Sequence, residues 1–316
     1  MRAIAITDFG GPDRLQVLDL PEPLVGPDTV RIRVRAAGVN PVDHKMRQGN
    51  LAGRFPHFFP LILGWDAAGV VESVGPAVVG FAPGDEVYGY FRKDHVRDGT
   101  YAELATMRDS ALAPKPATLS FEEAGAVPLA GLTALQVIRD ALDIRGGDRL
   151  LVLGASGGVG SFAVQIAKAR GAHVIAVAGA ANHDYLRELG ADEAIDYAAE
   201  DVVEAVRTVH PDGIEAVADF AGSPAPERSA DVLRRGRGRF ASIVQPPDRD
   251  AFAARGIDAR YIFVRADGAG LRTLAAMADA GELRVHLAQV VPLEEAARAH
   301  EQLETGHTRG KVVLRV

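Results

Sequence analysis

Cysteine is absent from this chain of 316 residues. A protein without cysteine has no disulfide, no thiolate nucleophile, no iron–sulfur cluster and no Cys-ligated zinc. Long apolar runs are also missing, because no stretch approaches the roughly 18 residues of a membrane span. The first residues, Met1–Ile6, are typical of a strand and too short for a signal peptide. We therefore expect no membrane association and a cytoplasmic location.

An excess of positive charge is missing too. The formal net charge is −7 and the isoelectric point about 5.7, so there is no global electrostatic attraction to nucleic acid. One basic run is present, at Arg234, Arg235, Arg237 and Arg239, with glycines between the arginines but no aromatic residue. This pattern favours a helix C-terminus and a glycine turn over an RNA-binding patch. We expect no nucleic-acid partner.

The first 120 residues or so carry the signals of short strands and turns. Residues 29–37 alternate β-branched and charged side chains, which is typical of a strand with one buried face. Further strands are expected at 69–75, 85–90 and 101–107, separated by proline and glycine. These features predict an irregular, β-rich domain.

After about residue 125 apolar strands alternate with helices, which predicts a parallel sheet covered on both faces. Mixed structure returns in the tail, with helices near 271–280 and 294–303 and a last strand at 311–316. We expect this tail to rejoin the first domain. The expected strands of the sheet are 149–155, 173–178, 193–197, 214–220, 239–244 and 259–264, and its expected helices are 159–170, 183–189, 201–209 and 225–234.

The strongest local signal is the glycine-rich turn Gly154–Gly160, which lies between an apolar strand and a helix. Dinucleotide-binding loops have this context, because glycine permits a tight turn and a close approach of the pyrophosphate to the helix N-terminus. Gly160 should let the helix pack close to the strand. Ala155 interrupts the strict G-x-G-x-x-G pattern, so the five further strand–helix alternations support the interpretation.

The second strand of the sheet bears on the choice of nucleotide. NAD-binding folds usually place an acidic residue where this strand ends, to bind the ribose hydroxyls. Residues 161–183 contain no Asp or Glu, which favours NADPH and leaves NADH open. The nearest polar side chains for a 2′-phosphate are Asn182 and His183.

Taken together, these residues resemble the zinc-free quinone oxidoreductases of the medium-chain dehydrogenase/reductase superfamily over essentially the whole chain. The resemblance implies an α/β fold in which a Rossmann-type parallel-sheet domain, 124–265, is inserted into a GroES-like β-rich substrate domain, 1–123 and 266–316. The matching segments are 147–168, 39–49, 64–69, 99–103, 128–134, 189–192 and 306–311.

Zinc alcohol dehydrogenases of the same superfamily have a Cys in the segment that corresponds to Val39–Asp43, and Gly-His-Glu where this chain has Gly64-Trp65-Asp66. A catalytic zinc needs three protein ligands. His44, His57 and His95 lack ligand-like spacing. We therefore expect no catalytic metal.

The resemblance also implies where a cofactor would lie. Residues near the pyrophosphate and nicotinamide would be Thr133, Ser156, Gly157, Gly158 and Val159. Those near the adenosine would be Gly179, Asn182 and Tyr197. The nicotinamide ribose and carboxamide would be bordered by Phe220, Ala221, Gly222, Ser242, Ile243 and Val244, and further cofactor contacts would come from Arg309 and Lys311. Relatives often have Ser-x-Arg-Asn where this chain has Gly179-Ala180-Ala181-Asn182, so the Ser and Arg that would hold a 2′-phosphate are missing.

Without zinc to polarise a carbonyl, the acceptor should already be activated, as a quinone or an α,β-unsaturated carbonyl is. A donor must stabilise the negative charge that develops on its oxygen. The candidates are Asn40, Lys45, Tyr88 and His44, with Asn40 preferred, while Asp43 could orient a donor. Each has an alternative: Asn40 and Asp43 could cap the helix that opens at Pro41, Lys45 could be a solvated lysine, and Tyr88 could belong to the core.

Two other functions fit the same sequence: an enoyl reductase accessory to a biosynthetic pathway, and a catalytically silent NADPH-binding sensor or structural protein. The expected partner is a small electrophilic substrate. We also expect a homodimer, because residues 260–264 form the last strand of the sheet in chain order, and an exposed edge favours pairing with a twofold mate.

Overall fold

The computed structural model describes residues 1–222 and 226–316. The chain forms two compact units. Unit 1 comprises residues 1–132, 266–281 and 285–316, and unit 2 comprises 133–265 and 282–284.

Unit 1 is built on two sheets. One has the order β2-β1-β4-β7, and the other has the order β16-β17-β3-β5-β6-β9 with β8 also paired to β3. The late strand β17 lies antiparallel to β3, with Val313 opposite Gly38, so the tail of the chain completes the second sheet. The strands are β1 Arg2–Ile6, β2 Gln16–Asp19, β3 Thr29–Val39, β4 His57–Ile62, β5 Asp66–Val74, β6 Glu86–Tyr90, β7 Val96–Asp98, β8 Leu104–Arg108, β9 Leu112–Pro114, β16 Leu287–Pro292 and β17 Lys311–Arg315.

Helices fill the space around these sheets. The helix α2 packs against β3 and β5, and a Cβ on its Gly125 would lie 3.0 Å from the carbonyl oxygen of Ala36. The close approach of α2 to β3 therefore depends on a residue without a side chain. The helices of unit 1 are α1 Pro41–Arg47, α2 Phe121–Ala126, α9 Gly268–Asp279 and α10 Ala296–Glu304, and α3 Pro128–Leu135 contains the boundary with unit 2.

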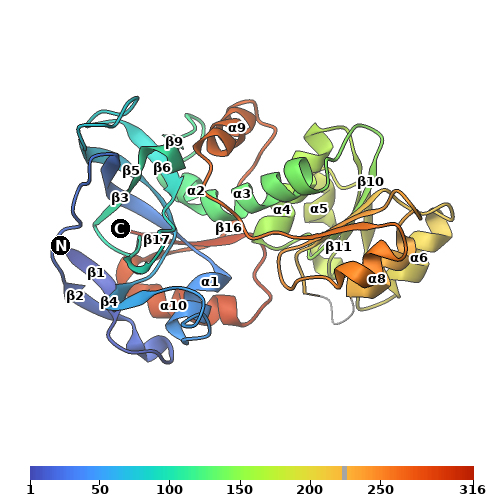
Figure 1. The fold of residues 1–316 in the computed structure, drawn as a ribbon, viewed down its shortest axis with the longest axis horizontal. Coiled ribbons are helices and arrows are strands. Elements are labelled where there is room, and N and C mark those ends of the chain that lie inside the picture. The colour runs from blue at the N-terminus through green and yellow to red at the C-terminus, as the bar shows by residue number, and fades with distance from the viewer. Residues whose placement is uncertain (223–225) are drawn as a thin grey trace. The chain divides into compact units, whose positions relative to one another are not determined.

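Unit 2 is a six-stranded parallel sheet with the order β12-β11-β10-β13-β14-β15 and helices to both sides (Figure 1). The strand β10 pairs with β11 on one side and β13 on the other, so the strand order reverses at β10. Its residues Leu150–Leu153 are all buried, as expected for a strand covered on both faces. The strands are β10 Arg149–Leu153, β11 His173–Val177, β12 Glu193–Ile195, β13 Ala216–Asp219, β14 Arg239–Ser242 and β15 Asp258–Tyr261.

Helices follow most of these strands. The longest, α4, begins at Gly158 directly after the glycine turn, with Gly157 at its N-cap. The helices are α4 Gly158–Ala169, α5 His183–Glu188, α6 Val202–Val209, α7 Pro226–Ser229, α8 Arg249–Ala253 and a π-helix at Gln136–Ala141. Among the described residues of both units, short 3₁₀ segments are η1 Pro12–Arg14, η2 Asp109–Ala111, η4 Ala180–Asn182, η5 Ala230–Val232 and η6 Leu293–Glu295.

Several expected elements differ from the structure. The helix expected at 225–234 is the short α7 followed by η5, and its first residue lies outside the described residues. The arginine run that follows is therefore not a helix C-terminus: Arg234 pairs with Glu215 and Arg239 with Asp148. The last strand ends at Tyr261 rather than Val264, because the side chain of Gln136 binds both backbone groups of Arg265 and leads the chain away from the ladder.

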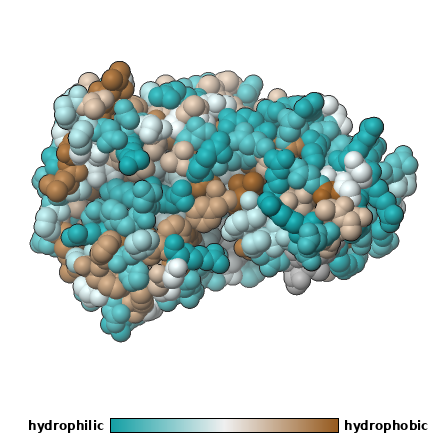
Figure 2. Space-filling model, in the orientation of Figure 1, coloured by the Kyte–Doolittle hydropathy of each residue, from teal (hydrophilic) through white to brown (hydrophobic). Residues whose placement is uncertain are grey.

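The face of the molecule in Figure 2 is mostly hydrophilic, and hydrophobic residues gather in separate groups. Within residues 1–222 and 226–316, no helix has both the length and the apolar character needed to cross a bilayer.

Candidate active site and cofactor site

The glycine turn after β10 has the geometry of an anion-binding loop. Gly154 adopts a φ of +72°, which favours glycine. A Cβ on Gly160 would lie 2.3 Å from the carbonyl oxygen of Gly154, so a side chain there would force α4 away from the turn. Ser156, Gly157, Gly158 and Val159 are half-buried, which leaves the N-terminus of α4 open to a ligand. The backbone N–H groups at such a helix start attract an anion.

The loops after β13 and β14 are joined by a buried pair that the sequence did not reveal. Asp219 is fully buried, and its Oδ2 accepts a hydrogen bond of 3.0 Å from the Ser242 hydroxyl. Its Oδ1 accepts from the backbone N–H groups of Ala221 and Gly222, each at 3.1 Å. The Ser242 hydroxyl also accepts a hydrogen bond of 3.2 Å from the backbone N–H of Val244. Asp219 thus fixes two neighbouring loops at the carboxyl edge of the sheet.

These two loops contain the residues that the resemblance placed beside the nicotinamide. Phe220, Gly222 and Ile243 are half-buried, Ala221 is exposed, and Val244 is 44% exposed. They follow β13, which neighbours β10, and β14, the next strand beyond it, on the side of the strand-order reversal where ligands bind in open parallel sheets. Thr133, at the start of unit 2, is buried.

The end of β11 offers space and little charge. Gly179 and Asn182 are half-buried, Ala181 is exposed, and Tyr197 is 61% exposed. The Nε2 of His183 is 3.1 Å from the carbonyl oxygen of Ala178, so this ring is already engaged. No arginine or lysine lies in the stretch 171–186.

In unit 1, Asn40 and Asp43 form a capping box at the start of α1. The backbone N–H of Asn40 donates to Asp43 Oδ2 at 2.8 Å, and its side-chain Nδ2 donates to Asp66 Oδ2 at 2.9 Å. Asp66 Oδ1 accepts from the backbone N–H of Leu129 at 2.8 Å. Asn40 and Asp43 therefore cap α1, as one of the sequence interpretations expected. In addition, Asp66 holds the side-chain amide of Asn40.

Lys311 supplies the positive charge of this cluster. Its ammonium is buried and donates to the carbonyl oxygen of Val39 at 3.0 Å and to Asn40 Oδ1. Burial raises the pKa of Asp43 to about 6 and that of Asp66 to about 7, and the attraction of Lys311 partly offsets both shifts. Burial lowers the pKa of Lys311. Because this ammonium already has protein partners, its expected contact with a cofactor stays a prediction.

A chain of polar contacts leads from Asp43 toward the surface of unit 1. The Tyr101 hydroxyl donates to Asp43 Oδ2 at 3.0 Å and lies 3.2 Å from His300 Nε2. His300 Nδ1 lies 3.2 Å from Arg47 NH1, and Arg47 also pairs with the exposed Glu304. Burial and the nearby Arg47 lower the pKa of His300 to about 3. Tyr101 lies in the matching segment 99–103 but was not expected to have a role in the site, and His300 belongs to no matching segment. The two residues are 199 positions apart in the chain.

The remaining candidates are Tyr88, Lys45, His44 and Arg309. The Tyr88 hydroxyl is buried and donates to the carbonyl oxygen of Leu271 at 2.5 Å, so its single hydrogen is already used within the core. Lys45 and Arg309 are exposed, and His44 is half-buried. Burial lowers the pKa of His44.

The fold and these two sites define a medium-chain dehydrogenase/reductase. Two family models match the chain: an alcohol dehydrogenase GroES-like domain at residues 26–117 and a zinc-binding dehydrogenase domain at residues 189–314. The human mitochondrial NAD(P)H oxidoreductase RTN4IP1 is 32% identical and aligns over 92% of this chain and 82% of its own length. The NADPH-dependent alkenal/one oxidoreductase of Arabidopsis thaliana chloroplasts is 33% identical over 99% of this chain and 79% of its own.

Solved structures agree with this assignment. A structure titled as an NAD-dependent alcohol dehydrogenase is 37% identical with a TM-score of 0.90, and each chain is covered completely. The Escherichia coli quinone oxidoreductase in complex with NADPH is 29% identical with a TM-score of 0.89, again over all of both chains. The chain belongs to the zinc-free quinone-oxidoreductase-like family and is an oxidoreductase that uses a nicotinamide cofactor.

Proposed function

We propose that this protein reduces a quinone or an α,β-unsaturated carbonyl with NADPH and does not need a catalytic metal. The observation that carries the proposal is the open glycine turn at the N-terminus of α4, beside two loops fixed by Asp219 and Ser242. A bound NADPH would supply the hydride, and the turn at Ser156–Val159 would hold its pyrophosphate. Relatives that act on quinones or on alkenals and enones support the acceptor class.

Asn40 is the proposed donor to the acceptor oxygen. Lys311 holds its Oδ1 and Asp66 takes one hydrogen of its Nδ2, so the amide plane is fixed and a second amide hydrogen remains. A fixed donor stabilises developing negative charge without reorganising during the reaction. Asp43 then acts as a positioning residue, and Lys45 remains a secondary candidate donor.

NADPH oxidation with a panel of quinones and enones, followed by absorbance, tests this function. We expect turnover with at least one class and unchanged turnover after chelator treatment. Preference for enones would favour the enoyl-reductase alternative. Tight NADPH binding without turnover on any acceptor would instead identify a sensor or structural protein, and loss of turnover that zinc restores would refute metal independence.

Two further expectations belong to the proposal. The edge position of β15 supports a homodimer formed by pairing of this strand with its twofold mate. The cytoplasmic location stays a prediction that cell fractionation can test, since relatives include mitochondrial and chloroplastic proteins.

A further inference from the structure

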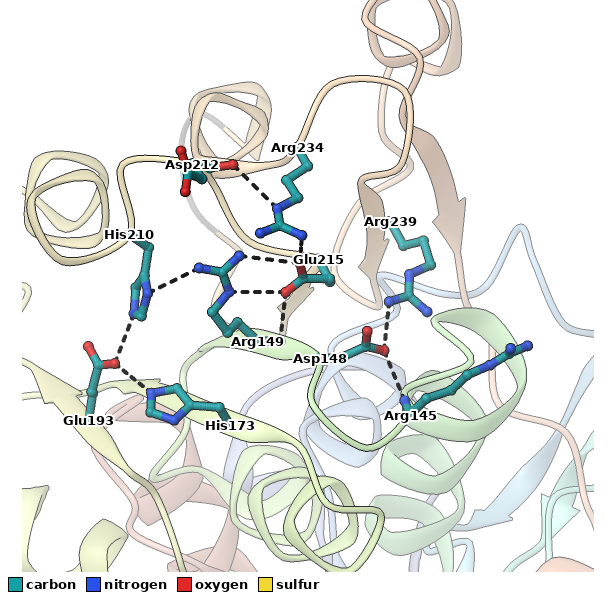
Figure 3. Close-up of polar contacts among 10 residues, drawn as sticks. All are labelled: Arg145, Asp148, Arg149, His173, Glu193, His210, Asp212, Glu215, Arg234 and Arg239. Carbon is teal, nitrogen blue, oxygen red and sulfur yellow. Dashed lines mark hydrogen bonds and ion pairs between the residues drawn. The ribbon is translucent and has the colours of Figure 1, made fainter.

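Three side chains converge at the amino end of the sheet in unit 2, opposite the edge that carries the cofactor loops. His173 is the first residue of β11, Glu193 is the first residue of β12, and His210 follows the last residue of α6 (Figure 3). They come from three separate elements and point toward one another. None of them takes part in the function proposed above.

Their ligand atoms are close together, and their side chains are partly exposed. The Nε2 of His173 is 2.6 Å from Glu193 Oε1, and the Nε2 of His210 is 2.8 Å from the same oxygen. The side chains are 40%, 26% and 11% exposed for His173, Glu193 and His210. None of the three side chains is closed off from solvent.

We propose that His173, Glu193 and His210 bind a divalent transition-metal ion such as Zn²⁺. Two imidazoles and a carboxylate are ligands that zinc accepts, whereas Mg²⁺ and Ca²⁺ prefer oxygen alone. Within residues 1–222 and 226–316 this is the one group of three such side chains whose ligand atoms lie within 4.8 Å of one another. Solvent would complete the coordination.

The present spacing needs a small adjustment to accept an ion. Bonds of about 2.05 Å in tetrahedral geometry place ligand atoms about 3.3 Å apart. Both contacts to Glu193 Oε1 are shorter than this, so the carboxylate must move back by roughly half an ångström or slightly more. Glutamate has a long side chain that can make this movement by rotation. The ion then takes the place of the protons that the imidazoles share with Glu193.

The surroundings of His173 favour a metal. Its Nδ1 lies 3.8 Å from Asp192 Oδ2, and a carboxylate on this side stabilises the proton that Nδ1 carries once Nε2 binds the ion. Asp192 is itself fixed by Lys168 and by the backbone N–H of Val174. Asp192 is thus in place beside Nδ1 of His173 before an ion binds.

The surroundings of His210 lower the expected affinity for a metal ion. Its Nδ1 lies 3.5 Å from a guanidinium nitrogen of Arg149, which Glu215 holds in place (Figure 3). When Nε2 binds an ion, Nδ1 carries the proton and faces this cation. We therefore expect moderate affinity, below that of a dedicated structural zinc site. An ion here would join the starts of two strands to the end of α6, so it should stabilise unit 2 without entering hydride transfer.

Zinc titration of the whole, chelator-treated protein tests the proposal. A zinc-sensitive dye competes for the ion, and thermal unfolding is followed in parallel with Zn²⁺ or with Mg²⁺. We expect one saturable zinc equivalent and a rise in Tm with Zn²⁺ but not with Mg²⁺. His173→Gln, His210→Gln and Glu193→Gln should each weaken zinc binding by more than about tenfold, because loss of an outer-shell partner alone costs about that much. Each should also remove the rise in Tm.

The controls separate this site from general binding to surface groups. His307→Gln removes an exposed histidine of unit 1, and Glu204→Gln removes an exposed carboxylate of α6. Both should bind zinc as the wild-type protein does. Circular dichroism without metal verifies that each variant is folded. Absence of a saturable equivalent, or equal binding by the His173→Gln and His307→Gln proteins when both are folded, would overturn the proposal whatever the outcome of the NADPH assays.

Discussion

His300 is a neutral imidazole in the interior of unit 1. Burial and the neighbouring Arg47 lower its pKa to about 3, against an ordinary value near 6.5. The native state therefore does not take up a proton at His300 between these pH values, whereas the unfolded chain does. Stability contributed by the neutral ring is complete above pH 6.5 and is lost as the pH falls toward 3.

His300→Gln should lower the free energy of unfolding near neutral pH, but this deficit should shrink in acid. Each pH unit below 6.5 costs the wild-type protein about 1.4 kcal/mol that the variant does not lose. From about pH 7.5 to about pH 5 the difference between the two proteins should narrow by roughly 2 kcal/mol. Urea unfolding at the two pH values measures it.

The buried carboxyls change the stability with pH in the opposite direction to His300. Asp43 and Asp66 have raised pKa values in the native state, so the native state binds protons more readily than the unfolded chain and gains stability as the pH falls from about 7 toward 4. The wild-type and His300→Gln proteins both contain Asp43 and Asp66. The difference between their free energies of unfolding is therefore largely free of this effect. If the free energy of unfolding of His300→Gln lies below that of the wild type by the same amount at both pH values, His300 is not held neutral by burial.

Ala181 governs the expected choice between the two nicotinamide cofactors. It is exposed in the middle of η4, where an arginine would meet a 2′-phosphate. Ala181→Arg should strengthen NADPH binding several-fold through a charge-assisted contact and leave NADH binding nearly unchanged. Titration of both cofactors by calorimetry measures the two dissociation constants. Ala181→Gln, which lengthens the side chain without charge, is the matched control, and an equal gain for NADH would contradict the phosphate contact.

Residues in the glycine turn could be predicted from the sequence, since glycines between a strand and a helix follow from local chain geometry. Asp219 could not, because its role depends on the parallel pairing that sets it beside Ser242. The same holds for Tyr101 and His300, which meet through tertiary packing alone. Asn40 and Asp43 could be predicted from their own sequence segment. Their contacts with Asp66 and Lys311 could not, because they form only when the strands of the sheet come together.

At the scale of elements, the packing of α4 on the glycine turn depends on Gly160. Gly160→Ala places a Cβ only 2.3 Å from the carbonyl oxygen of Gly154. The helix must shift, so we expect a loss of about 1–3 kcal/mol in the free energy of unfolding, the usual cost of overpacking, and weaker NADPH binding. Denaturant unfolding and cofactor titration measure these two effects.

Gly146→Ala is the matched control, because its added Cβ would meet nothing closer than 3.7 Å and its φ is not in the left-handed region. This variant should keep wild-type stability and cofactor affinity. A Gly160→Ala protein as stable as the control would mean that the turn adapts without cost.

Periodicity predicts the elements of unit 2 well, since buried parallel strands appear as continuous apolar runs. It does not predict where β15 stops, because a side chain from the π-helix, Gln136, binds the backbone of Arg265. The strand β16 was also missed. Only one of its residues is fully buried, and the strand is set by pairing with β17 rather than by its own pattern.

At the scale of the whole molecule, the free edge of β15 predicts the dimer interface. The N–H groups of Asp258 and Ile262 point to β14, so those of Ala259 and Tyr261 face the open edge. Tyr261→Pro removes an outward donor while sparing the ladder to β14, and should weaken a strand-paired dimer. Light scattering across micromolar concentrations measures the mass.

Tyr261→Ala removes the same side chain but keeps the N–H group, so it should remain dimeric. A wild-type monomer, or a Tyr261→Pro protein that folds and dimerises as the wild type does, would place the contact elsewhere. Phe263, within the strand expected at 259–264, lies beyond the end of β15 and is therefore not the position for this test.

Lys311 has a consequence for the order of events during translation. It lies 272 residues after Val39, to whose carbonyl it donates, and its ammonium is the cation beside Asp43 and Asp66. A nascent chain that has not yet produced β17 would have to bury two carboxylates without a counter-charge, which is costly. Residues 133–265 are contiguous and contain every strand of their own sheet. The inserted unit can therefore complete its sheet on the ribosome while the surrounding unit, begun first, finishes last.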